Sequence, residues 1–461
     1  MNSKTKVSKA GLFITDWAFY KQMLVIALPI AFQNLVSQGV QMMDTLMLGQ
    51  LGDSQISGVA TANQIYFIFG LFLFGLSAGA SVLCAQYWGK GDRKAVRRVM
   101  AIALRISLSI GLLFFLAVLL MPEALLRIYT NDAEVIACGL GYLKIVSPIY
   151  LTTAFSSAYM MLIRAAKNVR ISLICNIVTF LLNVFFNWVF IFGRLGAPAM
   201  GARGAALGTL IARLGELILI GVYASFIERQ IGFRFRDLGR FDRPLLRDFI
   251  HYAMPVVANE VLWGLGTSME IALLGRLGKE VITANAISSN IAQILTVFLF
   301  GVADSALVIV GNEIGAGRKE YARSCARTFE LLSAVIGVLL SVTILLVRRP
   351  ALSIFRIGPK SAEYARSFMT VIALVAPAQC YNCTSVVGLF RGGGDTKTGF
   401  VIDTAGLWLY AIPLGALLIF AFHLPAVPVF FAMRREEVFK AAAAFFHLRT
   451  GRWVRSVTRE A

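Results

Sequence analysis

Acidic and amide side chains recur at helical spacing inside the long apolar segments of this 461-residue sequence. Asp44 lies in the first such segment, and a helix would carry it on one face together with Gln33, Ser37 and Gln41. A carboxylate there can bind a cation, or a proton if burial disfavours its charged form. Because an ionised group at the centre of a bilayer costs about 2.5–3.5 kcal/mol, we expect this face to line a polar cavity. Interhelical hydrogen bonding is the alternative interpretation.

A second apolar segment repeats this face at a shift of 226 residues. Glu270 takes the position of Asp44, and the residues that accompany it are Asn259, Trp263 and Thr267. Glu260 lies beside the second face and corresponds to Asn34 of the first segment. We expect these residues also to line a cavity, with interhelical hydrogen bonding again as the alternative.

Other polar residues inside apolar segments have two interpretations. Asp304 and Asp403 are either coupling sites or buried hydrogen-bonded groups. Pairs at i, i+3 can neutralise each other along a helix, so we predict structural ion pairs for Arg213 with Glu216 and Arg434 with Glu437. Taken alone, three further residues indicate helix packing, namely Asn183, Asn187 and Thr209.

The composition excludes a water-soluble globule. Hydrophobic residues make up 58% of the chain and charged residues 15%, whereas soluble domains have about 45–50% apolar and about 25% charged residues. We predict an all-α integral membrane protein with twelve transmembrane helices. They lie near 22–48, 59–88, 99–121, 136–163, 169–192, 204–227, 249–275, 284–314, 328–347, 364–390, 398–420 and 424–448.

The placement of the basic residues predicts the orientation. Segments on the side of the N-terminus carry 28 Lys and Arg residues, and the opposite loops carry 9. This bias predicts that both termini are cytoplasmic and that the first helix is retained rather than cleaved. The net charge of +19 is thereby explained without a nucleic-acid partner. Three His and six scattered Cys predict no metal site and no cofactor.

An internal repeat divides the chain. Residues 27–99 align without a gap to 253–325, with 20 identities in 73 positions. Two parallel halves of six helices each predict two pseudo-symmetric bundles around a central cleft and transport by alternating access. The predicted domains are an N-terminal segment (1–21), an N-lobe (22–228), a linker (229–247), a C-lobe (248–448) and a basic tail (449–461).

The motifs resemble the multidrug and toxin extrusion (MATE) family, in its NorM-like bacterial branch. They are LPIAFQNLVSQGVQMMDTLMLGQLG, AQYWGKGD, GNEIGAGR, LNVFFNWVFIFG, GARGAALGT and LFRGGGDTK. The resemblance implies a two-lobe exporter that exchanges an organic cation for H+ or Na+, with Asp44 as a coupling residue and Asn183 and Thr209 in the same N-lobe site.

The sequence also departs from the family pattern. Where some members have a second Asp, this chain has Asn187. At the two C-lobe positions of the sodium-coupled branch it has Trp263 and Cys380, for which Glu260 and Asn382 are the candidate substitutes.

We therefore expect a monomeric antiporter of the bacterial inner membrane that exports cationic amphiphilic drugs or toxic metabolites. One alternative is a lipid-linked saccharide flippase, which would need basic cavity residues. A channel or receptor is another. No nucleotide loop or nucleophile–base pattern indicates an enzyme, since LFRGGGDTK lacks the spacing of a phosphate-binding loop.

Overall fold

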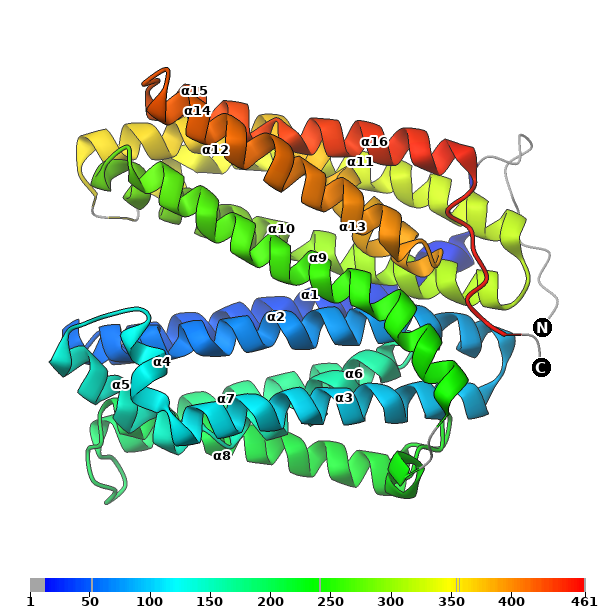
Figure 1. The fold of residues 1–461 in the computed structure, drawn as a ribbon, viewed down its shortest axis with the longest axis horizontal. Coiled ribbons are helices and arrows are strands. Elements are labelled where there is room, and N and C mark those ends of the chain that lie inside the picture. Colours follow the sequence, from blue (N-terminus) through cyan, green and yellow to red (C-terminus); the bar gives the residue numbers. More distant parts are fainter. Residues whose placement is uncertain (1–12, 51–52, 240–241, 354, 356, 460–461) are drawn as a thin grey trace. The chain divides into compact units, whose positions relative to one another are not determined.

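The computed structural model describes residues 13–50, 53–239, 242–353, 355 and 357–459, and within them the chain is helical, without a β-strand (Figure 1). Its contacts group the described residues into two units. The N unit comprises residues 32–84 and 93–251, and the C unit comprises residues 13–31, 85–92 and 252–459. The predicted lobe boundaries remain a prediction.

The helices of the first half begin with α1 and α2, whose ends belong to the C unit, and continue through the N unit. In chain order they are α1 (Trp17–Leu48), α2 (Asp53–Lys90), α3 (Arg93–Leu120), α4 (Pro122–Arg127), α5 (Ala133–Val146), α6 (Ile149–Ala165), α7 (Arg170–Phe192) and α8 (Ala202–Val222), followed by the short segments η1 (Tyr223–Ile227) and η2 (Phe235–Gly239). Within this unit α7 packs along α8 and α3 along α6. Its core holds an aromatic cluster in which the rings of Phe69 and Tyr150 lie 5.0 Å apart.

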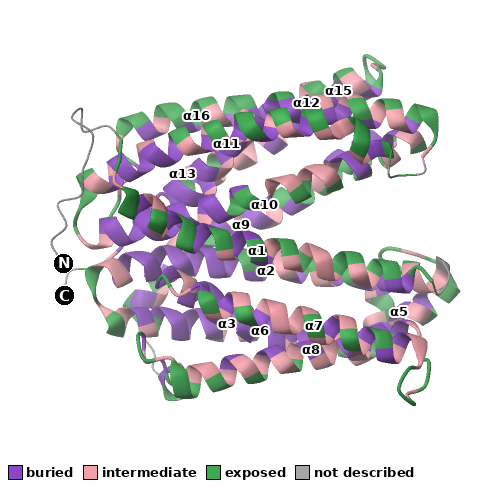
Figure 2. Cartoon of the chain, turned by 180° about the vertical axis from the view of Figure 1, so that it is seen from behind, coloured by how far each residue is buried: buried purple, intermediate pink, exposed green. Residues whose placement is uncertain are grey.

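The second half forms most of the C unit. Its helices are α9 (Arg243–Gly275), α10 (Lys279–Gly315), α11 (Lys319–Ser353), α12 (Pro359–Cys383), η3 (Thr384–Phe390), α13 (Thr396–Thr404), η4 (Ala405–Ala411), α14 (Ile412–Phe420), α15 (Ala426–Arg434) and α16 (Glu436–Thr450). Here α12 packs against α10 and α11, and Phe368 stacks on Phe430 with ring centroids 4.1 Å apart. Figure 2 shows buried and exposed residues mixed along the long helices, whereas α6 has no exposed residue.

Nine of the described helices are long and apolar enough to cross a membrane. They are Trp17–Leu48, Ser54–Lys90, Arg93–Leu120, Arg170–Phe192, Ala202–Ile227, Lys279–Gly315, Lys319–Ser353, Pro359–Phe390 and Thr396–Phe420. The pair α5 and α6, bent by 56°, makes a tenth if it is one broken span.

The prediction of twelve transmembrane helices is therefore not confirmed, whereas the prediction of a helical protein with many membrane spans is confirmed. Two of the predicted membrane spans are not among these helices. Segment 249–275 lies in α9, which carries a polar face, and segment 424–448 is divided between α15 and α16. In both, polar and charged residues interrupt the apolar run.

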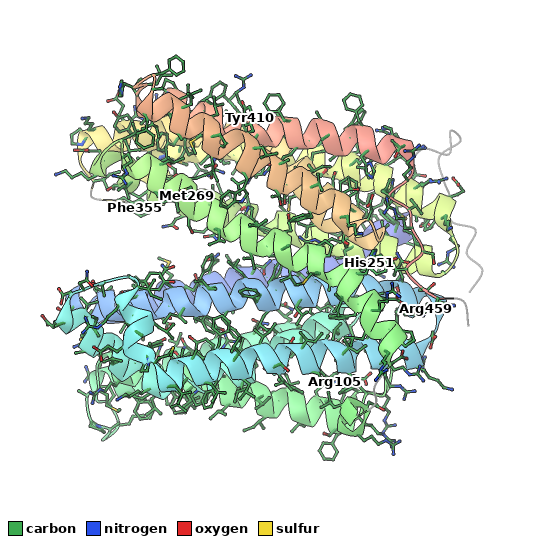
Figure 3. The ribbon with its side chains drawn as sticks, in the orientation of Figure 1. Arg105, His251, Met269, Phe355, Tyr410 and Arg459 are labelled. Carbon is green, nitrogen blue, oxygen red and sulfur yellow. The ribbon has the colours of Figure 1, made fainter. Side chains whose placement is uncertain are left out.

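Two long helices contain a proline near the point where they pass between units. Helix α1 leaves the C unit after Ala31 and contains Pro29, and α9 enters the C unit after His251 (labelled in Figure 3) and contains Pro255. Because proline lacks an N–H donor, each helix loses one backbone hydrogen bond there, which permits a bend.

Within the C unit, the ends of α2 and α10 cross at glycines. A Cβ atom on Gly89 would lie 1.9 Å from the carbonyl oxygen of Asn312, and one on Gly315 would lie 1.8 Å from that of Gln86. The repeat shift of 226 residues relates Gly89 to Gly315 and Gln86 to Asn312. The crossing is thus a pseudo-symmetric contact that requires glycine on both sides.

The C-terminal tail is fixed against this crossing. The side-chain amide of Gln86 donates to the carbonyl oxygens of Gly392 (3.1 Å) and Arg455 (3.0 Å), and its oxygen accepts from the backbone N–H of Val457 (2.9 Å). Trp453 is only 2% exposed. Residues 451–459 are therefore packed along the C unit rather than extended into solvent.

We predict that Gly89→Ala lowers the thermal unfolding midpoint of the detergent-purified protein, because overpacking costs about 1–3 kcal/mol. Gly70→Ala is the matched control in the same helix, since no atom lies within 4 Å of the added Cβ. Ala also favours the helix by about 1 kcal/mol, so this control should be neutral or stabilising. Equal shifts in the two variants would contradict the close crossing.

Candidate functional site

Four polar residues of the N unit form one hydrogen-bonded chain. The Asn187 side-chain nitrogen donates to the Asp44 carboxylate at 2.5 Å and to Asn183 Oδ1 at 3.3 Å. Asn183 in turn donates to the Thr209 hydroxyl at 3.2 Å. Helices α1, α7 and α8 thus contribute to a single site. It contains Asp44, Asn183 and Thr209, the three residues that the family resemblance implies, together with Asn187.

Glycines of α8 bring this chain together. A Cβ on Gly204 would lie 2.3 Å from the Phe190 carbonyl oxygen, and one on Gly208 would lie 2.3 Å from Asn187 Oδ1. The two glycines are four residues apart, so they form a strip on which α7 approaches closely, as small residues allow between membrane helices. Thr209 follows the second glycine and thereby reaches Asn183.

The chain is buried in its middle and half-buried at both of its ends. Asn183 and Asn187 are 2% and 0% exposed, whereas Asp44 and Thr209 are half-buried. Asn187 Oδ1 has no hydrogen-bond partner, and the second Asp44 oxygen accepts none from the described residues. The site therefore offers unsatisfied acceptors to a cation or a proton.

Arg213 supplies positive charge near this site. Its guanidinium lies 2.7 Å from Glu216 and is close enough to attract the Asp44 carboxylate electrostatically. The pairing of Arg213 with Glu216 is the one that the i, i+3 spacing predicted. Because Glu216 offsets the Arg213 charge, Asp44 is left with one amide donor and a partly neutralised neighbour.

The other residues of the predicted polar face of α1 differ in burial. Gln33 is buried, and Arg164 from the end of α6 donates to its side-chain oxygen at 3.4 Å. Ser37 and Gln41 are exposed on the surface of the N unit, and Asn34 is half-buried. Polar side chains thus continue from the site onto the surface of the unit.

A second polar cluster lies within the C unit and is centred on a lysine. The Lys440 ammonium is 3.4 Å from Asp403, 3.2 Å from Glu436 and 3.9 Å from Glu437, and the side chain is only 4% exposed. The sequence analysis named Asp403 and Glu437 but missed Lys440. Its spacing of i+3 and i+4 from the two glutamates, inside an apolar segment, was the available signal.

Two amides complete this Lys440 cluster. The Asn382 nitrogen donates to Glu437 at 3.1 Å and to Asp403 at 3.5 Å, and the Asn259 nitrogen donates to Asp403 at 3.3 Å. Three buried oxygens remain without a partner, on Asn259, Asn382 and Glu436. The cluster therefore has one resident cation, three carboxylates and an excess of acceptors.

Glu260 lies beside the Lys440 cluster, close enough to Asp403 for mutual repulsion, and forms a buried ion pair of its own. Arg391, at the end of η3, donates to its carboxylate at 2.6 Å. The half-buried Asp304 is close enough to Glu260 for mutual repulsion, and Trp263 on the same helix is 45% exposed. The coupling role expected for Glu260 remains a prediction.

The predicted pair of Arg434 with Glu437 is wrong. Arg434 instead faces Glu270 at 3.9 Å, and Glu437 belongs to the Lys440 cluster. Arg434 is the last residue of α15, and its side chain reaches Glu270 on α9, whereas Glu437 on α16 lies 3.9 Å from Lys440. The Glu270–Arg434 pair mirrors the proximity of Asp44 to Arg213 in the N unit.

Among the residues that the structure describes, no group of three or more His, Cys, Asp or Glu side chains is arranged to hold a metal ion. The candidate sites are instead the amide–carboxylate chain of the N unit and the Lys440 cluster of the C unit.

Comparison with known proteins gives a consistent result over both repeats. The MatE family model matches residues 29–189 and 255–417. A probable multidrug resistance protein NorM from Thermotoga maritima is 25% identical over 444 residues, which cover 95% of each chain. One from Bradyrhizobium diazoefficiens is 26% identical over 419 residues, which cover 89% of each chain.

Solved structures share the fold. A crystal structure of MATE in complex with MaL6 matches with a TM-score of 0.86 at 15% identity, over 94% of this chain and 96% of that chain. A MOP superfamily transporter from Pyrococcus furiosus matches with a TM-score of 0.84 at 15% identity, over 94% of this chain and 95% of that chain.

We predict that Lys440→Met destabilises the protein by about 3–5 kcal/mol, because it leaves buried carboxylates without a counter-charge. Adding Glu436→Gln should restore part of the loss. Lys397→Met is the matched control, since Lys397 is exposed at the start of α13. Thermal unfolding in detergent measures the effect, and a wild-type midpoint in Lys440→Met would refute a structural role for the ammonium.

Proposed function

Since the chain belongs to the MatE family and is a membrane transporter rather than an enzyme, we propose that it exports cationic amphiphilic drugs or toxic metabolites in exchange for H+ or Na+. The names of the NorM relatives support multidrug export. The observation that carries the exchange mechanism is the hydrogen-bonded chain at Asp44, where a carboxylate has an accessible side and a buried amide support.

The Asp44 carboxylate is the proposed exchange site. Ionised, it attracts either the coupling ion or a cationic substrate, and either one neutralises it. If both compete for this group, binding of one favours release of the other. Moving one charge through 100 mV releases about 2.3 kcal/mol, which sustains a substrate gradient of about fortyfold when coupling is complete.

The exposed polar residues beside Asp44 support a cavity in this position. Ser37 and Gln41 lie at the surface of the N unit on the same face of α1. Exposed polar groups of a membrane helix favour water or protein over lipid. We propose that this surface faces the cavity through which the substrate passes by alternating access.

The Lys440 cluster is proposed to be mainly structural. Its resident ammonium already occupies the position that a coupling ion would take among the three carboxylates. We therefore assign ion exchange to the N unit and a structural role to the Lys440 cluster of the C unit.

We propose that both termini are cytoplasmic in the inner membrane of a bacterium and that the monomer is the working unit. The distribution of basic residues supports the orientation, and the bacterial NorM relatives support the location.

We predict that Asp44→Asn abolishes most efflux while the protein still inserts normally. Losing the charge removes at least about 1.4 kcal/mol of differential cation binding, so the rate should fall about tenfold or more. Dye transport in everted vesicles measures it, with proton and sodium gradients imposed separately. Glu134→Gln, an exposed carboxylate-to-amide change at the start of α5, is the control. Wild-type transport by Asp44→Asn would end the proposal.

We also predict that Glu260→Gln impairs export more than Glu216→Gln. The partner of Glu260 is buried Arg391, whereas Arg213 is half-exposed, and removing one partner of a buried pair is the costlier change. Export should be measured per amount of folded transporter in the membrane. If the loss disappears after this correction, Glu260 acts only in folding. The reverse order of the two variants would contradict its importance for export.

A further inference from the structure

A small basic cavity lies at the start of α3 in the N unit. Its volume is about 70 Å³, and it is lined by Lys94, Arg97, Arg98 and Asp237. The walls come from the first two turns of α3 and from η2, which pack against each other within the N unit. Figure 1 shows the connection between α8 and α9 beside the start of α3.

The linker wall of this cavity has a defined conformation. The Glu228 carboxylate accepts the backbone N–H groups of Ile231 and Gly232 at 2.7 and 2.8 Å, and Gly232 adopts a φ of 67° that favours glycine. Arg97 donates to the Gly232 carbonyl oxygen at 3.4 Å. The buried Asp237 accepts the backbone N–H of Arg234 at 3.0 Å. These bonds hold the linker over the start of α3.

The cavity keeps a net positive charge, because three basic side chains face the two carboxylates of Asp237 and Asp242. Arg98 is paired with Asp242 at 2.8 Å, but Lys94 and Arg97 form no ion pair with any residue that the structure describes. Lys94 is exposed and Arg97 half-buried. The cavity therefore suits a small anion.

The cavity lies at the level expected for lipid headgroups. The apolar run of α3 begins at Val99, directly after Arg98. On the other wall, the linker follows Phe226 and Ile227, whose side chains are 76% and 62% exposed. Large exposed apolar groups next to basic residues mark the boundary between acyl chains and headgroups. An anion with acyl chains fits this boundary better than a free one does.

We propose that Lys94 and Arg97 bind the phosphate of an anionic phospholipid in the cytoplasmic leaflet. This leaflet carries the anionic lipids that juxtamembrane basic residues recognise. The proposal rests on the membrane orientation given above and is independent of the exchange mechanism at Asp44.

The test measures phosphatidylglycerol binding to the full-length protein in dodecyl maltoside, by native mass spectrometry and by the thermal unfolding midpoint. Phosphatidylcholine and inorganic phosphate are the comparison ligands. Wild type should bind phosphatidylglycerol in preference to phosphatidylcholine. The double variant Lys94→Gln/Arg97→Gln should weaken phosphatidylglycerol binding about thirtyfold, from about 1 kcal/mol for each basic residue.

Arg170→Gln is the matched control, because Arg170 is also exposed in the first turn of a helix and has no ion pair with the described residues. It should leave phosphatidylglycerol binding unchanged within about twofold, since Arg170 does not line the cavity. If the double variant does not fold, Lys94→Gln alone, which changes an exposed side chain, gives the same comparison, and Lys94→Arg should retain binding.

Three results would overturn the proposal. One is equal weakening in Arg170→Gln, which would reveal nonspecific attraction by overall charge. Another is equal stabilisation of wild type by inorganic phosphate, which would identify a free-anion site. The last is no preference of wild type for phosphatidylglycerol over phosphatidylcholine.

Discussion

A carboxylate inside a membrane helix needs a polar partner, and for Asp44 that partner is the side-chain amide of Asn187 at 2.5 Å. The amide can stabilise the ionised carboxylate by donating a hydrogen bond, but it brings no positive charge that would replace an incoming cation. The close packing of α7 on the glycines of α8 fixes this amide. The proposed exchange mechanism depends on an amide that supports the charge of Asp44 without neutralising it.

The two repeats share a backbone pattern but differ in their chemistry. Each brings an arginine to its first long helix, Arg164 to Gln33 and Arg391 to Glu260. The acidic positions then differ, because the C unit fills its polar interior with the Lys440 ammonium, whereas the N unit leaves Asp44 with an amide. The two repeats thus share their packing but differ in the polar groups that they bury.

Sequence reasoning predicted the helical membrane architecture, the Arg213–Glu216 pair and most of the residues that form the two polar sites, since local spacing and the repeat determine them. The amide bridge through Asn187 was not predicted, because contacts between α1 and α7 depend on helix packing. Arg434 was assigned the wrong partner because its contact with Glu270 on α9 depends on helix packing. Lys440 was missed because an acidic cluster draws attention to its carboxylates rather than to the cation that neutralises them.

The most direct test is competition between the coupling ion and substrate for the purified transporter. Calorimetric titration with a cationic dye should show an apparent affinity that falls as the H+ or Na+ concentration rises, and this dependence should vanish in Asp44→Asn. If the dependence persists unchanged in that variant, ion and substrate do not share the Asp44 carboxylate, and the account is contradicted.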